Sequence, residues 1–131
     1  MSDDLIYLAF TTLLTAFMWV PYILNRVSVR GLVSAVGYED NPKPVAPWAQ
    51  RLQAAHYNAI ENLAIFAPLV LIVEQQGIGS VATGMSSMVF FIARCVHAVS
   101  YTLAVPYVRT GAFAVGFLSI LCIAWTILTS M

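Results

Sequence analysis

Charged residues are scarce in this chain. Only 9% of its 131 residues are charged and 60% are hydrophobic, with a mean hydropathy of +0.83. A soluble domain carries about 25% charged residues, so this chain has too few polar side chains to cover a water-exposed surface. We therefore expect a membrane protein. The net charge of zero and the lack of a basic run argue against nucleic-acid binding.

Cysteine and targeting signals are equally sparse. The two cysteines, Cys95 and Cys122, fall in apolar segments without metal-ligand spacing, so we expect no metal site and two buried, chemically inert thiols. The N-terminus lacks the basic stretch and small-residue cleavage site of a signal peptide. The first apolar run should therefore be retained as a membrane span.

Four apolar runs have the length of about 20 residues that a membrane-spanning helix needs. They cover Leu5–Leu24, Leu52–Val73, Val81–Val105 and Gly111–Thr129. The connection Asn25–Gln50 is long, whereas Gln75–Ser80 and Pro106–Thr110 are short, which favours antiparallel neighbours. We predict one domain over residues 1–131, an all-α up-down bundle of four transmembrane helices. Pro21 and Pro68 should kink the first two spans.

The basic residues are distributed unevenly among the connections. Arg26, Arg30, Lys43 and Arg51 flank the first connection and Arg109 lies in the third, whereas the second connection and both termini have none. Basic residues concentrate on the cytoplasmic side, so both termini should be non-cytoplasmic. The compact loops suit a bacterial inner membrane, with a eukaryotic organelle as the alternative.

The second span carries polar residues at membrane depth, where they usually face a bundle interior or a cavity. Arg51, Asn58, Glu61 and Asn62 fall on one face of a helix with 3.6 residues per turn. His56 points nearly the opposite way and should make a different contact.

The third span carries a matching stripe of Arg94, His97 and Tyr101 at spacings of three and four. Glu61 and Arg94 should lie at a similar depth, which predicts an ion pair between them. Two interpretations remain open. The pair could be a purely structural lock, or it could belong to a polar pocket that opens to the cytoplasm and also contains Asn58, His97, Tyr101 and Arg109.

Two stretches resemble the signatures of a known family. "RLQAAHYNAIENLAIFAPLVL" contains His56, Asn58 and Glu61, and "ARCVHAVSYTLAVPYVR" contains Arg94 and the residues that follow it, His97, Tyr101 and Arg109. With "EDNPKP" in the first connection and four spans, the whole chain resembles the membrane-associated proteins in eicosanoid and glutathione metabolism, the MAPEG family.

This resemblance implies a homotrimer that binds glutathione between neighbouring subunits near the cytoplasmic side. The residues it implicates in binding are Asn58, Glu61, Arg94, His97, Tyr101 and Arg109, with Arg26 or Arg30 reaching the ligand of a neighbouring subunit. A nearby cation or hydroxyl would lower the pKa of the thiol. The catalytic candidates for that role are Arg109 first, then Thr110, then Tyr101.

The implied activity is that of a glutathione-dependent transferase or peroxidase acting on lipophilic electrophiles or hydroperoxides from the lipid bilayer. The alternative is a non-catalytic membrane protein of the same fold that binds lipid or scaffolds a partner. Ala54 and Tyr57 stand where mammalian branches of the family carry arginine, which leaves room for another thiol or an anionic lipid. A transporter is disfavoured because the spans lack an inverted repeat and broken helices.

Overall fold

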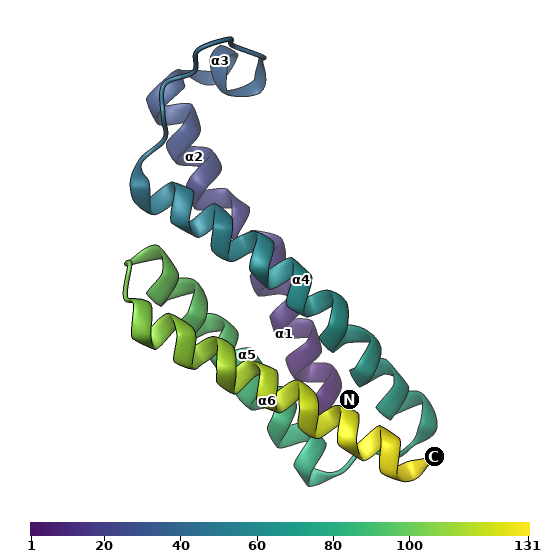
Figure 1. Ribbon diagram of the computed structural model, residues 1–131. Coiled ribbons are helices and arrows are strands. Elements are labelled where there is room, and N and C mark those ends of the chain that lie inside the picture. The colour runs from purple at the N-terminus through teal and green to yellow at the C-terminus, as the bar shows by residue number, and fades with distance from the viewer.

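The computed structural model describes residues 1–131, and the chain is entirely helical apart from short connections (Figure 1). The helices are α1 (Asp3–Phe17), α2 (Trp19–Arg30), α3 (Leu32–Val36), α4 (Pro47–Gln76), α5 (Val81–Thr102) and α6 (Pro106–Ser130). Four helical segments are long and apolar enough to cross a membrane, α1 and α2 together forming the first. The predicted bundle of four spans is confirmed.

The first span is interrupted at Met18, three residues before its single internal proline. Pro21 has no backbone N–H to donate to the carbonyl of Phe17, four residues earlier, and α1 ends at that residue. Met18 connects α1 to α2, its own N–H still bonded to the carbonyl of Leu14 at 3.1 Å. Pro68, in contrast, lies inside α4 without interrupting it.

Two of the predicted loops are shorter than the sequence suggested. The first was expected over Asn25–Gln50, but α2 continues to Arg30, α3 follows, and α4 already begins at Pro47. The third was expected over Pro106–Thr110, which is instead the first turn of α6. The physical reason is the same at both places. Proline suits the first helical position, where its missing N–H is not needed and its fixed φ matches the helix.

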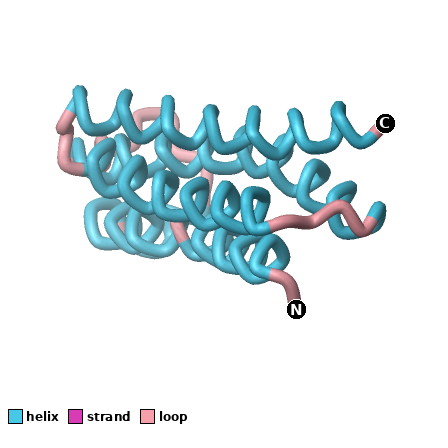
Figure 2. The backbone as a smooth tube through the Cα atoms, turned by 90° about the horizontal axis from the view of Figure 1, so that it is seen from below, coloured by secondary structure: helices cyan, strands magenta, loops and turns pink.

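The long helices run antiparallel, so the connections alternate between the two ends of the bundle. Both termini lie at one end, and α3 and the α5–α6 turn lie at the other (Figures 1 and 2). This arrangement places the basic first and third connections at the same end, as the four-span topology requires.

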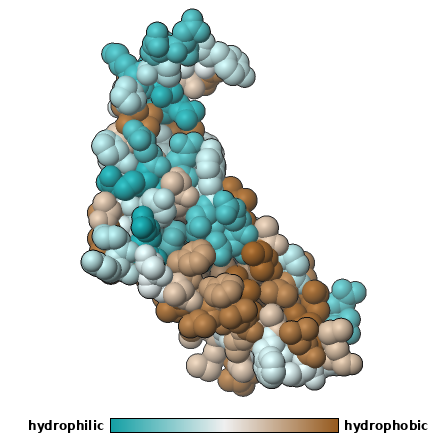
Figure 3. Space-filling model, viewed as in Figure 1, coloured by the Kyte–Doolittle hydropathy of each residue, from teal (hydrophilic) through white to brown (hydrophobic).

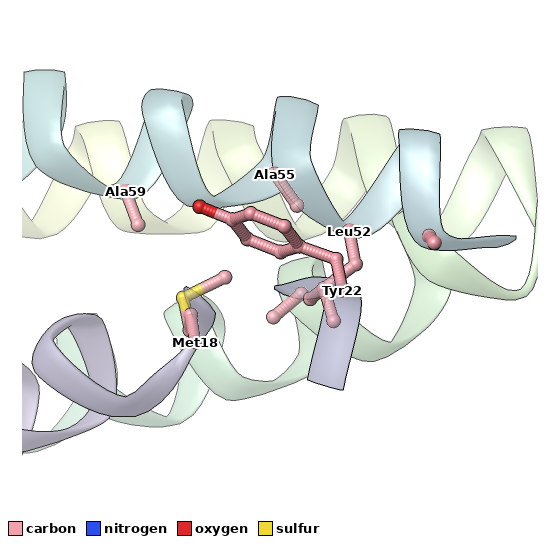
Figure 4. Packing of buried hydrophobic residues seen from close by; sticks show 7 residues of the cluster. Met18, Tyr22, Leu52, Ala55 and Ala59 are labelled. Atoms are coloured by element: carbon pink, nitrogen blue, oxygen red, sulfur yellow. The ribbon is translucent and has the colours of Figure 1, made fainter. Parts of the chain in front are cut away.

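Two separate apolar clusters hold the helices together. Near the α3 end, Met18 and Tyr22 pack against Leu52, Ala55 and Ala59 of α4, and the small alanines let the aromatic ring lie along the helix (Figure 4). Near the termini, Phe66 of α4 stacks on Phe90 of α5 with ring centroids 4.0 Å apart, and Ile120 and Ile123 of α6 complete this second cluster.

Many large apolar side chains remain outside these clusters and face outward. Phe17, Leu118 and Trp125 are each more than 60% exposed. Figure 3 shows hydrophobic side chains over the half of one face nearest the termini, and hydrophilic ones over α2, α3 and the middle of α4. The prediction of two buried thiols is wrong, because Cys122 lies on the outward face of α6 and is exposed, while Cys95 is half-buried.

A buried carboxylate joins the start of α1 to α5. Asp4 is only 3% exposed, and its two oxygens accept hydrogen bonds from the hydroxyls of Ser87 at 2.5 Å and Thr83 at 2.9 Å. Both hydroxyl residues are fully buried. These bonds fix the axial position of α1 relative to α5, because hydrogen bonds are directional and apolar contacts are not.

We expect Asp4→Ala to lower the free energy of unfolding by about 1–3 kcal/mol, because it removes the acceptor of the buried Ser87 hydroxyl and one of the two acceptors of the Thr83 hydroxyl. Thermal unfolding in detergent measures the change. The matched control is Asp3→Ala, which removes an exposed carboxylate from the same helical turn and should cost less than about 1 kcal/mol. Equal losses in the two variants would contradict this account.

The ends of α4 and α5 use the same capping motif with different residues. At α4, Gly77 has φ +64° and the N–H of Ile78 bonds to the carbonyl of Val73. At α5, Ala104 has φ +60° and the N–H of Val105 bonds to the carbonyl of Ser100. The left-handed position suits glycine, so Ala104 is strained and Gly77 is not.

We expect Ala104→Gly to stabilise the protein and Gly77→Ala to destabilise it, each by about 0.5–1 kcal/mol. A left-handed conformation costs an L-residue roughly 1–2 kcal/mol. Glycine avoids this cost but loses more chain entropy on folding, which offsets about half of the gain. A Cβ on Gly77 would meet no atom within 4 Å, so the comparison isolates backbone strain. Shifts of the unfolding temperature in the same direction for both variants would refute it.

Candidate functional site

The centre of the candidate site is the buried guanidinium of Arg94. Arg94 and His97 lie on one face of α5, each 3% exposed. The Nη2 of Arg94 donates to Asn58 Oδ1 on α4 at 2.7 Å and lies 3.3 Å from Nδ1 of His97. Because arginine can only donate, Nδ1 of His97 acts as the acceptor in this contact. The cluster therefore joins α4 to α5 through a charged hydrogen bond.

The predicted ion pair between Glu61 and Arg94 does not form within the protomer. Arg94 is bonded to Asn58 instead, and Glu61 is exposed on the outer side of α4. Three residues along a helix turn the side chain by about 60°, which is enough to take Glu61 off the face that meets α5. Asn62 supports Asn58 by donating to its carbonyl at 2.8 Å and to its Oδ1 at 3.3 Å.

The polar stripe continues from α5 to the start of α6. The rings of His97 and Tyr101 meet edge to face with centroids 5.6 Å apart, and Cζ of Arg109 lies 4.9 Å from the ring centroid of Tyr101. That distance is within the range of a cation–π contact. Four residues predicted to form the site, Arg94, His97, Tyr101 and Arg109, are therefore in contact in sequence order. Thr110 is exposed next to Arg109, and its hydroxyl makes no hydrogen bond.

Two contacts around the stripe were not found from sequence. The ring of Phe113 on α6 lies 6.3 Å from that of His97 and borders the cluster. The Nε of Arg51 donates to the carbonyl of Thr102 at 2.9 Å, which places a cation at the carboxyl end of α5. Cations are favoured there by the helix dipole, but no pattern within one helix reveals a partner on another.

His56 makes the separate contact that its position predicted. Its Nδ1 lies 2.7 Å from the hydroxyl of Tyr22 on α2, on the opposite side of α4 from the Arg94 cluster. This bond ties α2 to α4 and takes no part in the polar stripe.

The two basic residues at the end of α2 differ in their bonding. Arg30 donates through Nε to the carbonyl of Lys43 at 2.7 Å and so anchors the first connection. The Nε of Arg26 is buried without any hydrogen-bond partner. Neither residue is bonded to the Arg94 cluster of its own protomer.

The cluster around Arg94, together with the stripe that extends it through Tyr101 to Arg109, contains cations but no anion. No carboxylate lies within 4.0 Å of Arg94 or Arg109, and the Nε of Arg94 is buried without a partner. An unpaired donor on a buried charge is costly, so the cluster suits a ligand that supplies acceptors. The five principal hollows of the protomer surface are lined by other residues. None of these hollows reaches Arg94 or His97, which are each only 3% exposed.

We expect Asn58→Ala to lower the free energy of unfolding by about 1.5–3 kcal/mol, since it removes the acceptor of a buried charged donor. Asn58→Asp keeps an oxygen at that position and should retain most of the stability. Thermal unfolding of the ligand-free protein in detergent tests both variants. If the alanine and aspartate variants lost stability equally, the hydrogen bond to Arg94 would not be what Asn58 contributes.

The fold and the site together define an integral membrane protein whose spanning helices share a buried, cationic cluster near one end of the bundle. The profile of the MAPEG family matches residues 5–129, and the chain belongs to this family. No curated protein and no solved structure matches the chain. Members of the family generally use glutathione as a cosubstrate and are generally trimeric.

Proposed function

We propose that this protein is a glutathione-dependent transferase or peroxidase that acts on lipophilic electrophiles or hydroperoxides. The observation that carries the proposal is the cationic cluster without an anion, in which the buried Nε of Arg94 has no partner. A tripeptide with two carboxylates supplies the missing acceptors.

The residues present fit the chemical groups of glutathione. Its carboxylates suit guanidinium groups, which bind them through paired hydrogen bonds. Its ammonium suits a free carboxylate, and Glu61 is free because Arg94 is bonded to Asn58 instead. Asn58 and His97 complete the polar surface beside Arg94.

Arg109 is the residue we assign to the reacting thiol. Glutathione, when bound, supplies a thiol that is a nucleophile only in its ionised form, and a nearby cation favours that form. The guanidinium of Arg109 is half-exposed and rests on the ring of Tyr101, which fixes its position at the end of the stripe. Thr110 and Tyr101 offer hydroxyl donors on either side of it.

We also propose that the site is completed in a homotrimer. Glu61 lies on the exposed surface of a spanning helix, and a charge facing lipid at the centre of such a helix costs about 2.5–3.5 kcal/mol. A second copy packed on this face of α4 would remove that cost by covering Glu61. Arg26, whose Nε is unpartnered, is a better candidate than Arg30 for the contribution of the neighbouring subunit.

The basic residues set the orientation that this function requires. With the α3 end in the cytoplasm, the Arg109 end of the stripe faces the compartment that holds glutathione, and both termini lie outside. We propose a bacterial inner membrane because the compact connections suit it. Lipophilic substrates would then enter from the bilayer and glutathione from the cytoplasm.

We expect purified protein to bind glutathione in calorimetry and Arg109→Ala to weaken binding by about 10–100-fold, the effect of losing one charged hydrogen bond. Arg109→Lys should restore part of the affinity. Lys43→Ala removes an exposed cation from the same end of the bundle and is the matched control, expected to bind normally.

The same variants should be assayed for turnover of an aryl halide and of an organic hydroperoxide. Loss of turnover by Arg109→Ala at saturating glutathione supports a role at the thiol. Absence of binding by the unaltered protein at millimolar glutathione would reject the proposed function.

A further inference from the structure

We propose that a groove between α1 and α5 binds an acyl chain of a membrane phospholipid, and that Arg51 holds its phosphate. This α1–α5 groove has a volume of about 610 Å³, and ten of its 12 lining residues are hydrophobic. Its walls include Phe10, Leu13, Phe17 and Pro21 on one side, and Phe91 and Val99 on the other.

The length of the groove matches one leaflet of a bilayer. Phe10 and Pro21 are 11 positions apart, which is about 16 Å along a helix at about 1.5 Å per residue. Half of the hydrocarbon core of a bilayer is about 15 Å thick. The groove ends at Thr102 and Leu103, where α5 terminates near the α3 end of the bundle. It therefore runs from mid-membrane to one interface.

A cation stands at the interfacial end of the groove. Arg51 donates through Nε to the carbonyl of Thr102, a residue that lines the groove. Its two terminal nitrogens make no hydrogen bond in the protomer, and the side chain is only half-buried. A guanidinium with free donors at headgroup level is complementary to a phosphate. The apolar α1–α5 groove matches the acyl chain of a phospholipid, and the cation at its end matches the phosphate.

The α1–α5 groove is separate from the Arg94 cluster. Ala98, Val99 and Thr102 face the groove, whereas Arg94 and His97 face α4 and α6. The groove also differs from the surface that needs a second copy, which is the outer side of α4 that carries Glu61. A phospholipid is therefore the occupant that fits both the apolar walls and the charge, and its binding does not depend on the proposed activity.

Photo-crosslinking in vesicles tests the proposal. The full-length protein is reconstituted into equal parts of phosphatidylcholine and phosphatidylglycerol, with a trace of phosphatidylglycerol that carries a diazirine on its acyl chain. After irradiation, mass spectrometry maps the labelled residues. We expect labelling to concentrate on the segments Phe10–Pro21 and Phe91–Leu103. Arg51→Ala should reduce it about fivefold, whereas Arg51→Lys, which keeps the charge, should preserve most of it.

A variant that fills the groove and a matched control distinguish specific binding in the groove from general contact with lipid. Leu13, 54% exposed, lines the groove, whereas Leu121, 46% exposed, lies on α6 outside it and at a similar distance from the terminal end. Leu13→Trp should reduce labelling of the groove, and Leu121→Trp should not. Both variants should bind glutathione like the unaltered protein, so a failure here is distinct from a failure of the proposed function.

Three outcomes would overturn the proposal. The first is labelling spread evenly over exposed apolar residues of α6 as well as the groove. The second is labelling that Leu13→Trp and Arg51→Ala leave unchanged. The third is a groove that stays unlabelled while crosslinks join two protomers there, which would show that a second copy covers it.

Discussion

The structure depends on how one buried charge is held within the membrane. The guanidinium of Arg94 lies between α4 and α5, where a charge without partners would be too costly to keep. Asn58 supplies one acceptor and His97 a second contact, and Asn62 keeps the Asn58 amide in place. These contacts fix the rotation of α4 against α5. Because they are neutral amide and imidazole groups, the positive charge remains uncompensated, and that excess charge gives the site its chemical character.

The position of Glu61 follows from the same constraint. Asn58 faces α5, and Glu61, three residues later, lies on the exposed side of α4, where it forms no ion pair within its own protomer. A carboxylate that is unpaired and directed outward at membrane depth is unstable against lipid. The proposed homotrimer and the proposed binding of glutathione would each supply a partner to these unpaired groups, which links the proposed assembly to the proposed activity.

A second feature of the bundle, the α1–α5 groove, is lined mainly by apolar side chains. The first span is interrupted at Met18, three residues before Pro21, and α1 and α5 leave an apolar groove of about one leaflet's length between them. Arg51 is bonded to the carbonyl of Thr102, where this groove ends. Tight, directional contacts such as those of Asp4 and Tyr22 hold the spans in register beside a surface that remains open to lipid.

The sequence alone determined the four spans, the alternation of their ends and the polar stripe on α5. These features depend on the length of apolar runs, the placement of basic residues and a period of 3.6, all of which are local. The family signatures likewise lie within single helices. Tertiary structure decided that Arg94 bonds to Asn58 rather than Glu61, that Arg51 caps α5, and that α1 and α5 leave a groove. Each of these outcomes depends on how one helix is rotated against another, and that rotation is set by the packing of the whole bundle.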